Sequence, residues 1–113
     1  MPEPTVELLW WPGCPSTPEA LSDLRTAMSE LGLDPESVAV REIATDAQAQ
    51  DARFPGSPTI RVDGADVQPP EDREPPGLTC RVYRRRDGRI SPVPDPDDLR
   101  DALRAAALEE PSR

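Results

Sequence analysis

The chain has 113 residues, 35% of them hydrophobic, which is enough for one domain (residues 1–113, core about 4–107) with one modest core. Its net charge of −9 repels phosphate backbones and anionic lipid, and this argues against binding to nucleic acid or to a membrane surface. We expect a cytoplasmic location, because the sequence has neither the ~18-residue apolar run of a membrane span nor the basic and apolar regions of a secretion signal.

The first predicted elements are a strand and a helix separated by a short turn. The apolar run over 6–11 predicts a strand buried on both faces. A helix is expected over about 18–31, where leucine and methionine recur at helical spacing. Its N-terminal cap is either Thr17, followed by a proline at the first helical position, or Ser16, with a glutamate three residues later that completes a capping box.

Further strands and helices follow, separated by turn signals. In chain order the sequence predicts a strand over 38–43, a helix over 46–53 capped by Thr45, a strand over 59–62 closed by Asp63-Gly64, a long Pro- and acid-rich loop over 65–77, a strand over 78–85, a helix capped by Asp95, and a frayed tail over 109–113.

This order, β-α-β-α-β-β-α, predicts an α/β fold with a four-stranded mixed sheet and helices on both faces. Right-handed crossovers between the first three strands are expected to give a parallel core, to which the last strand adds antiparallel. In such sheets chemistry collects at the carboxyl ends of the strands, and Cys14 follows the first strand directly.

Cys14 is the first candidate for a reactive atom. The chain has one other cysteine, Cys80, and no histidine, so few side chains can do chemistry near neutral pH. A thiol just before a helix lies near the positive end of the helix dipole, which favours its thiolate form. Cys14 is therefore either an accessible, reactive thiol or a structural cysteine.

Two motifs resemble the thioredoxin superfamily. Pro12-Gly13-Cys14-Pro15 resembles the start of the glutaredoxin active site, and Gly56-Ser57-Pro58-Thr59-Ile60 resembles the segment that carries a cis-proline opposite the active cysteine. The pattern is also similar to small uncharacterised bacterial thioredoxin-like proteins, some of them labelled alkylmercury lyase. The resemblance implies a thioredoxin-like fold and a cis Ser57–Pro58 bond beside Cys14, with the backbone before the proline presented to a substrate peptide.

The second cysteine of a Cys-x-x-Cys motif is replaced here by Thr17. The resemblance therefore implies a monothiol site that needs an outside thiol to release a mixed disulfide. Thr17 is expected to cap the helix and to hydrogen-bond the thiolate, while Pro58 shapes the site. Trp11, Pro15 and Ser57 are the expected substrate-facing residues. No cofactor is expected, and glutathione-binding motifs are not evident.

Cys80 has two interpretations. If its strand pairs antiparallel with the third strand, Cys80 lies toward the opposite end of the sheet as a buried core thiol; a disulfide with Cys14 is the alternative. The basic cluster of Arg81 with 84–86 is either a charged edge strand or a contact for an anion or a partner.

Three functions follow as hypotheses. The first is thiol–disulfide exchange or thiol capping through Cys14, with a disulfide-containing protein or a small thiol as partner. The second is binding of a soft metal or an organomercurial by Cys14, with or without Cys80, because such ions need only one or two thiolates whereas zinc needs four ligands. The third is a non-catalytic interaction module that uses the proline face and the acidic loop.

Overall fold

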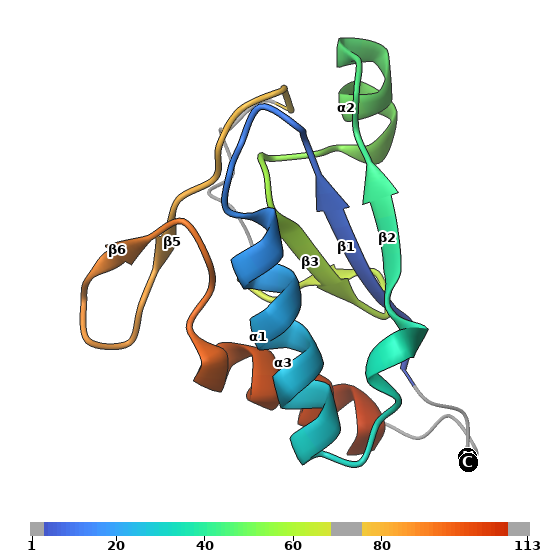
Figure 1. The fold of residues 1–113 in the computed structure, drawn as a ribbon, viewed down its shortest axis with the longest axis vertical. Helices are drawn as coiled ribbons and strands as arrows, with labels where there is room; N and C mark the ends of the chain where they lie inside the picture. Colours follow the sequence, from blue (N-terminus) through green and yellow to red (C-terminus); the bar gives the residue numbers. More distant parts are fainter. Residues whose placement is uncertain (1–3, 69–75, 109–113) are drawn as a thin grey trace.

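The computed structural model describes residues 4–68 and 76–108, and its centre is a four-stranded mixed sheet (Figure 1). The strand order is β2 (Ala39–Glu42), β1 (Val6–Trp10), β3 (Thr59–Val62), β4 (Ala65–Asp66). Strand β1 runs parallel to β2 and antiparallel to β3, and β3 is antiparallel to β4. The α/β class and the four-stranded mixed sheet agree with the sequence prediction.

The direction of β3 corrects the expected parallel core. The helix that precedes it, α2 (Asp46–Ala52), has seven residues and spans only about 10 Å. Helix α2 stays at the carboxyl end of β1 and β2, as Figure 1 shows, so the chain enters β3 from that same end. A parallel strand would need a connection that returns across the whole sheet.

Helices α1 (Thr17–Glu30) and α3 (Pro96–Leu108) cover one face of the sheet (Figure 1). Val6 and Leu8 point to that face and pack in the main core, while Leu9 points the other way because side chains alternate along a strand. Leu9 belongs to a second cluster that includes residues of α2 and its flanking segments. Helices therefore cover both faces, the second only near α2. The main core contains Val6, Leu8, Ala20, Leu24, Ala27, Met28, Ile60, Val62, Val93, Leu99 and Leu103; the second cluster contains Leu9, Ile43, Ala49 and Phe54.

The expected caps of α1 do not form. Ser16 precedes the helix with φ −89° and ψ −1°, and its side chain makes no capping hydrogen bond, because a cap needs extended backbone to turn the side chain back. Thr17 is the first helical residue. The predicted cap of α2 is confirmed, since Thr45 and Gln48 form a reciprocal capping box. Asp95 accepts from the amide of Asp97 at 2.9 Å at the start of α3.

The predicted strand over 78–85 is mostly wrong. Only β5 (Tyr83–Arg84) is a strand, and it pairs with β6 (Ile90–Ser91) in a separate two-stranded sheet. The fourth strand of the main sheet, β4, lies in the stretch predicted as a loop. It has already paired with β3, so 78–85 cannot add at that edge. Residues 69–75 of that predicted loop and the predicted frayed tail over 109–113 lie outside the described residues. None of the described helices has the length and apolar character needed to cross a bilayer.

Candidate functional site

Cys14 lies in the tight turn that joins β1 to α1. Its backbone amide donates to the carbonyl of Trp11 at 3.1 Å. The side chain turns inward, and Sγ donates to the backbone carbonyl of Ser57 at 3.4 Å. Cys14 is only 4% exposed, which contradicts the expected accessible thiol. The turn sets this orientation, because the short connection points the side chain at the loop before β3.

The loop before β3 carries a cis peptide bond between Ser57 and Pro58, as predicted. Ser57 Oγ accepts from the amide of Trp11 at 2.9 Å, which ties this loop to the end of β1. The hydroxyl of Tyr83 donates to the carbonyl of Pro58 at 2.5 Å. Burial raises the pKa of Tyr83 well above its usual range, so its hydroxyl remains a donor at any ordinary pH. Pro58 is thus held beside the turn of Cys14.

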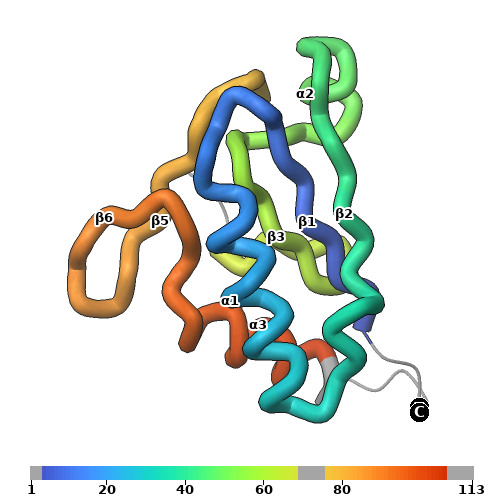
Figure 2. The backbone as a smooth tube through the Cα atoms, viewed as in Figure 1, coloured from blue at the N-terminus to red at the C-terminus, as the bar shows by residue number. Residues whose placement is uncertain are grey.

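Cys80 lies next to this loop. The amide of Ser57 donates to the carbonyl of Thr79 at 2.7 Å, and the amide of Arg81 donates to the carbonyl of Ser57 at 2.8 Å. These bonds form a parallel bridge between Ser57 and Cys80. In Figure 2 the tube that enters β5 passes beside the bend after β1. Cys80 is exposed, so its predicted burial is wrong. Its bridge with Ser57 puts it beside the loop before β3, so its predicted place at the opposite end of the sheet is also wrong.

The two cysteines meet at Ser57. Both are free thiols, one buried and one exposed. A hydrogen bond with Cys14, followed by lost solvation and by electrostatic interaction with Cys14, raises the pKa of Cys80 above its ordinary value. The structure therefore brings together two thiols that the antiparallel-strand interpretation separates and that the disulfide alternative places side by side. The one signal of this pairing in the sequence is that the chain has two cysteines, which can pair with each other.

Arg81 fixes the Cys80 segment, which comprises residues 79–82. Its guanidinium forms a buried ion pair with Asp66 at 2.6 Å and donates to Thr59 Oγ1 at 3.2 Å. It also lies 4.4 Å from the centre of the Tyr83 ring. The predicted basic cluster is thus divided, because Arg81 is buried, whereas Arg86 pairs with Asp98 and Asp101 on α3.

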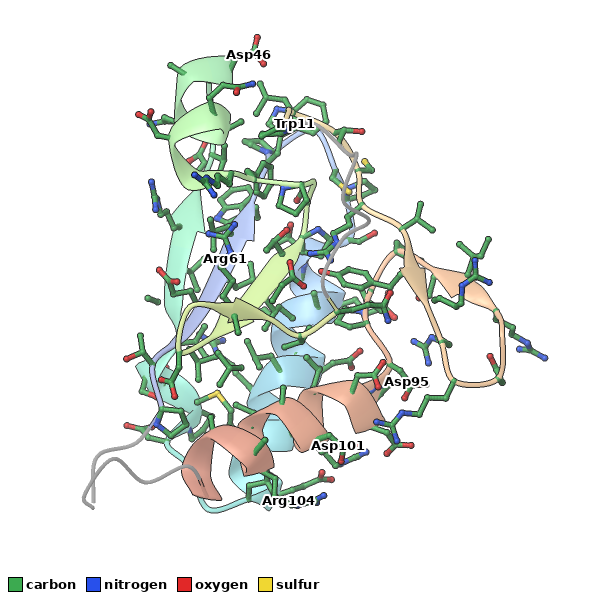
Figure 3. The ribbon with its side chains drawn as sticks, turned by 180° about the vertical axis from the view of Figure 1, so that it is seen from behind. Trp11, Asp46, Arg61, Asp95, Asp101 and Arg104 are labelled. Carbon is green, nitrogen blue, oxygen red and sulfur yellow. The ribbon has the colours of Figure 1, made fainter. Side chains whose placement is uncertain are left out.

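The expected substrate-facing residues have different surroundings. A Cβ added to Gly13 would lie 2.4 Å from the indole of Trp11, so this ring covers the glycine. Trp11 also packs against the second cluster, and Figure 3 shows it at the same end of the molecule as Asp46, the first residue of α2. Pro15 is exposed. The backbone groups of Ser57, expected to face a substrate, already bond to the Cys80 segment.

Thr17 does not take the role that the sequence predicted for it. Its Oγ1 is buried and has no hydrogen-bond partner in the part of the chain that the structure describes. It therefore neither caps α1 nor bonds to Cys14 there.

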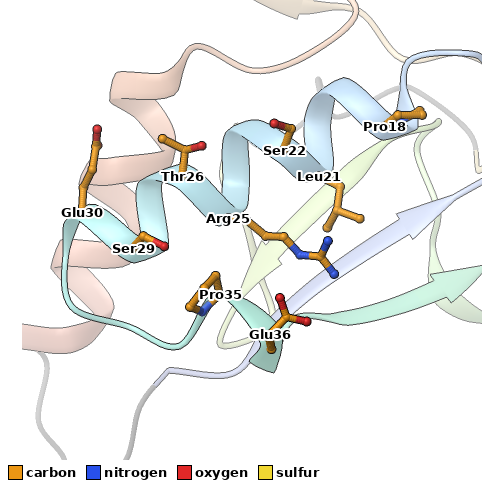
Figure 4. A pocket seen from close by; sticks show the side chains of 9 residues that line it. All are labelled: Pro18, Leu21, Ser22, Arg25, Thr26, Ser29, Glu30, Pro35 and Glu36. Carbon is orange, nitrogen blue, oxygen red and sulfur yellow. The ribbon is translucent and has the colours of Figure 1, made fainter.

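A groove of about 680 Å³ runs between α1 and the short turn of 3-10 helix at Pro35–Ser37. Arg25 extends across it toward Glu36, as Figure 4 shows. Its lining residues include neither cysteine. Within residues 4–68 and 76–108, no group of three or more potential metal ligands comes together. The thiol pair is therefore the chemical centre that these residues offer.

Comparison of the chain with protein-family models, with curated proteins and with solved structures finds no match in any of the three.

Proposed function

We propose that the protein performs thiol–disulfide exchange and that Cys14 and Cys80 are its redox pair. The observation that carries the proposal is their common attachment to Ser57. The Cys14 sulfur bonds to the Ser57 carbonyl, and Cys80 forms a bridge with the same residue. Two thiols so placed can give two electrons and two protons to a substrate disulfide and become joined by an S–S bond themselves.

The proposal changes the expected monothiol site into a dithiol site. Thr17 leaves no second thiol within α1, but Cys80 supplies one from the segment before β5. A low-molecular-weight thiol or a dithiol reductant would return the pair to its reduced form. We also propose a thioredoxin-like relationship. Its support is the cysteine between β1 and α1, the cis-proline before β3, and the mixed sheet.

The test is oxidation of the reduced protein with glutathione disulfide, followed by intact mass measurement and peptide mapping. The wild type should lose two hydrogens and form one Cys14–Cys80 disulfide. It should then reduce insulin or a small disulfide when a thiol is supplied. Cys14→Ser and Cys80→Ser should each abolish the intramolecular disulfide. Val82→Ser is the matched control, because Val82 is 64% exposed on the same segment and leaves both thiols in place. A wild type that never forms the Cys14–Cys80 disulfide would contradict the proposal.

The closeness of Cys14 and Cys80 at Ser57 also favours soft-metal or organomercurial binding as a second function. Two adjacent thiolates suffice for linear coordination of mercury or copper(I). We expect one mercuric ion per chain and a rise in thermal stability, both lost in each single Cys→Ser variant. Equal, weak binding of mercury by the two variants and the wild type would contradict a two-thiol site and show ordinary binding by single thiols.

A further inference from the structure

The two thiols differ in how a substrate can reach them. Exchange requires the attacking sulfur to approach a disulfide in line with its S–S bond, so the sulfur that attacks first must be open to a second molecule. Cys14 is 4% exposed and its sulfur points at the Ser57 carbonyl. Cys80 is exposed. An external disulfide therefore reaches Cys80 without any rearrangement of the fold.

The Cys80 segment is also well anchored for this task. Hydrogen bonds of 2.7 Å from the Ser57 amide to Thr79 and of 2.8 Å from the Arg81 amide to Ser57 hold the backbone on either side of Cys80. Bridged residues in a sheet have their strands about 4.8 Å apart. Cys80 is thus held beside the residue to which the Cys14 sulfur bonds, and a sulfur that gains a substrate stays within reach of Cys14.

The raised pKa of Cys80 lowers its reactivity without closing it to a substrate, whereas burial closes Cys14. The hydrogen bond with Cys14 raises the pKa of Cys80 and lowers its thiolate fraction. With a Brønsted coefficient of about 0.4–0.5, each unit of raised pKa costs about tenfold in thiolate and returns about threefold in nucleophilicity. The net loss is only about threefold for each unit. The Cys14 sulfur, in contrast, is buried and bonded to the Ser57 carbonyl, so a second molecule cannot approach it in the folded protein.

We propose, resting on the function proposed above, that Cys80 attacks the external disulfide and that Cys14 is the resolving cysteine. In the first step the Cys80 thiolate forms a bond to one substrate sulfur, and the other substrate sulfur leaves as a thiolate. In the second step the Cys14 thiolate attacks the Cys80 sulfur, which breaks the mixed disulfide and releases the remaining half of the substrate as a thiolate. The two substrate thiolates take up from water the two protons that the Cys14 and Cys80 thiols release to it. The products are the Cys14–Cys80 disulfide and two substrate thiols, so two electrons pass from the pair to the substrate. The motif around Cys14 predicts instead that Cys14 attacks first and that an outside thiol releases the mixed disulfide.

The substrate class follows from Ser57. Its amide and carbonyl already bond to the Cys80 segment, so a substrate peptide cannot add to them as an extra strand. Recognition then depends on the disulfide and on side chains around Cys80. The substrates are accordingly small disulfides and protein disulfides that are themselves exposed.

The test measures the rate at which each reduced single variant reacts with a disulfide. The first disulfide is the chromogenic dithiobis-nitrobenzoate, and the second is glutathione disulfide. Cys14→Ser should form a stable mixed disulfide on Cys80, at least about tenfold faster than Cys80→Ser reacts at Cys14, because access limits the buried thiol. The two rates should become similar in urea, where both thiols are open. Faster or equal reaction of Cys14 in the folded Cys80→Ser variant would overturn the assignment.

Wild-type protein supplies a measurement that needs no variant. Rapid acid quenching and peptide mapping should find the transient adduct on Cys80, followed by the Cys14–Cys80 disulfide. An adduct found first on Cys14 would overturn the order of attack while leaving the redox pair intact. Absence of the intramolecular disulfide would instead remove the proposed function, so the two failures are distinct. Cys14→Ala replaces Cys14→Ser if the serine variant does not fold.

Discussion

Replacing Arg81 by methionine removes a buried guanidinium that joins β3, β4 and the Cys80 segment. It contacts Asp66 at 2.6 Å and Thr59 at 3.2 Å, donates to the carbonyl of Gln68, and lies over the ring of Tyr83. The side chains of the ion pair are 5% and 11% exposed, so the carboxylate left behind is uncompensated. Breaking such a pair costs about 3–5 kcal/mol. An unfolding entropy of about 2.1 cal/mol/K per residue gives about 0.24 kcal/mol/K for 113 residues, so Tm should fall by about 13–21 °C.

Urea and thermal unfolding measure this loss, and Asp66→Asn separates its cause. In the wild type, Asp66→Asn should destabilise the protein. In the Arg81→Met background it should restore about 1–2 kcal/mol, because it removes the uncompensated charge. Arg89→Met is the control: the Arg89 side chain is 84% exposed, so its loss should change stability by less than about 0.5 kcal/mol. A loss below about 1 kcal/mol in Arg81→Met, or simple additivity with Asp66→Asn, would refute the reasoning.

Three further changes test separate parts of the structure. Gly56→Ala should lower the free energy of unfolding in urea by about 1–3 kcal/mol, because Gly56 has φ +142° and an added Cβ would lie 3.1 Å from the Cβ of Arg81. Unchanged stability would show that the loop adjusts freely. Thr17→Val should leave stability unchanged or raise it by up to about 1 kcal/mol, since the buried hydroxyl has no partner among the described residues. Slower Cys14–Cys80 disulfide formation in this variant would instead show that the Thr17 hydroxyl assists the Cys14 thiol. Burial, and then the charge of Glu19, raise the pKa of Asp23, so ionisation of this carboxyl costs stability in the folded protein. Asp23→Asn should therefore raise Tm at pH 7. The gain should vanish as the pH falls below about 4, because the carboxyl is then protonated in the unfolded protein too. A gain that grows in acid would contradict this.

Several elements could be predicted from short stretches alone. The capping box of Thr45 and Gln48, the start of α3 at Asp95, and strand β3 all formed where local patterns placed them. In each case a few neighbouring residues determine the conformation, so no distant contact is needed.

The hairpin between β3 and β4 has a local signal in the sequence. Asp63-Gly64 marks a reversal of the chain as well as the end of β3. Both residues have positive φ, 52° and 83°, as a type I′ hairpin turn requires. An Asp-Gly pair at the end of an apolar strand predicts that the chain turns back at once. Strand β4 could therefore have been predicted in place of a strand over 78–85.

The burial of Cys14 and the place of Cys80 had no local signal. Both depend on the loop at Ser57, which meets the Cys14 turn on one side and the Cys80 segment on the other. They also depend on β3 running antiparallel to β1, which brings that loop to the carboxyl end of the sheet. Such contacts join distant residues, and their geometry comes from the whole sheet rather than from the pattern of one segment.

The sequence by itself therefore determined the helices, the first three strands, the cis-proline position and the identity of the two thiols. Only the tertiary structure decided which thiol is exposed and that the two lie together. The physical reason is that caps and periodicity act over a few residues, whereas the pairing of strands and the burial of a side chain are properties of the assembled core.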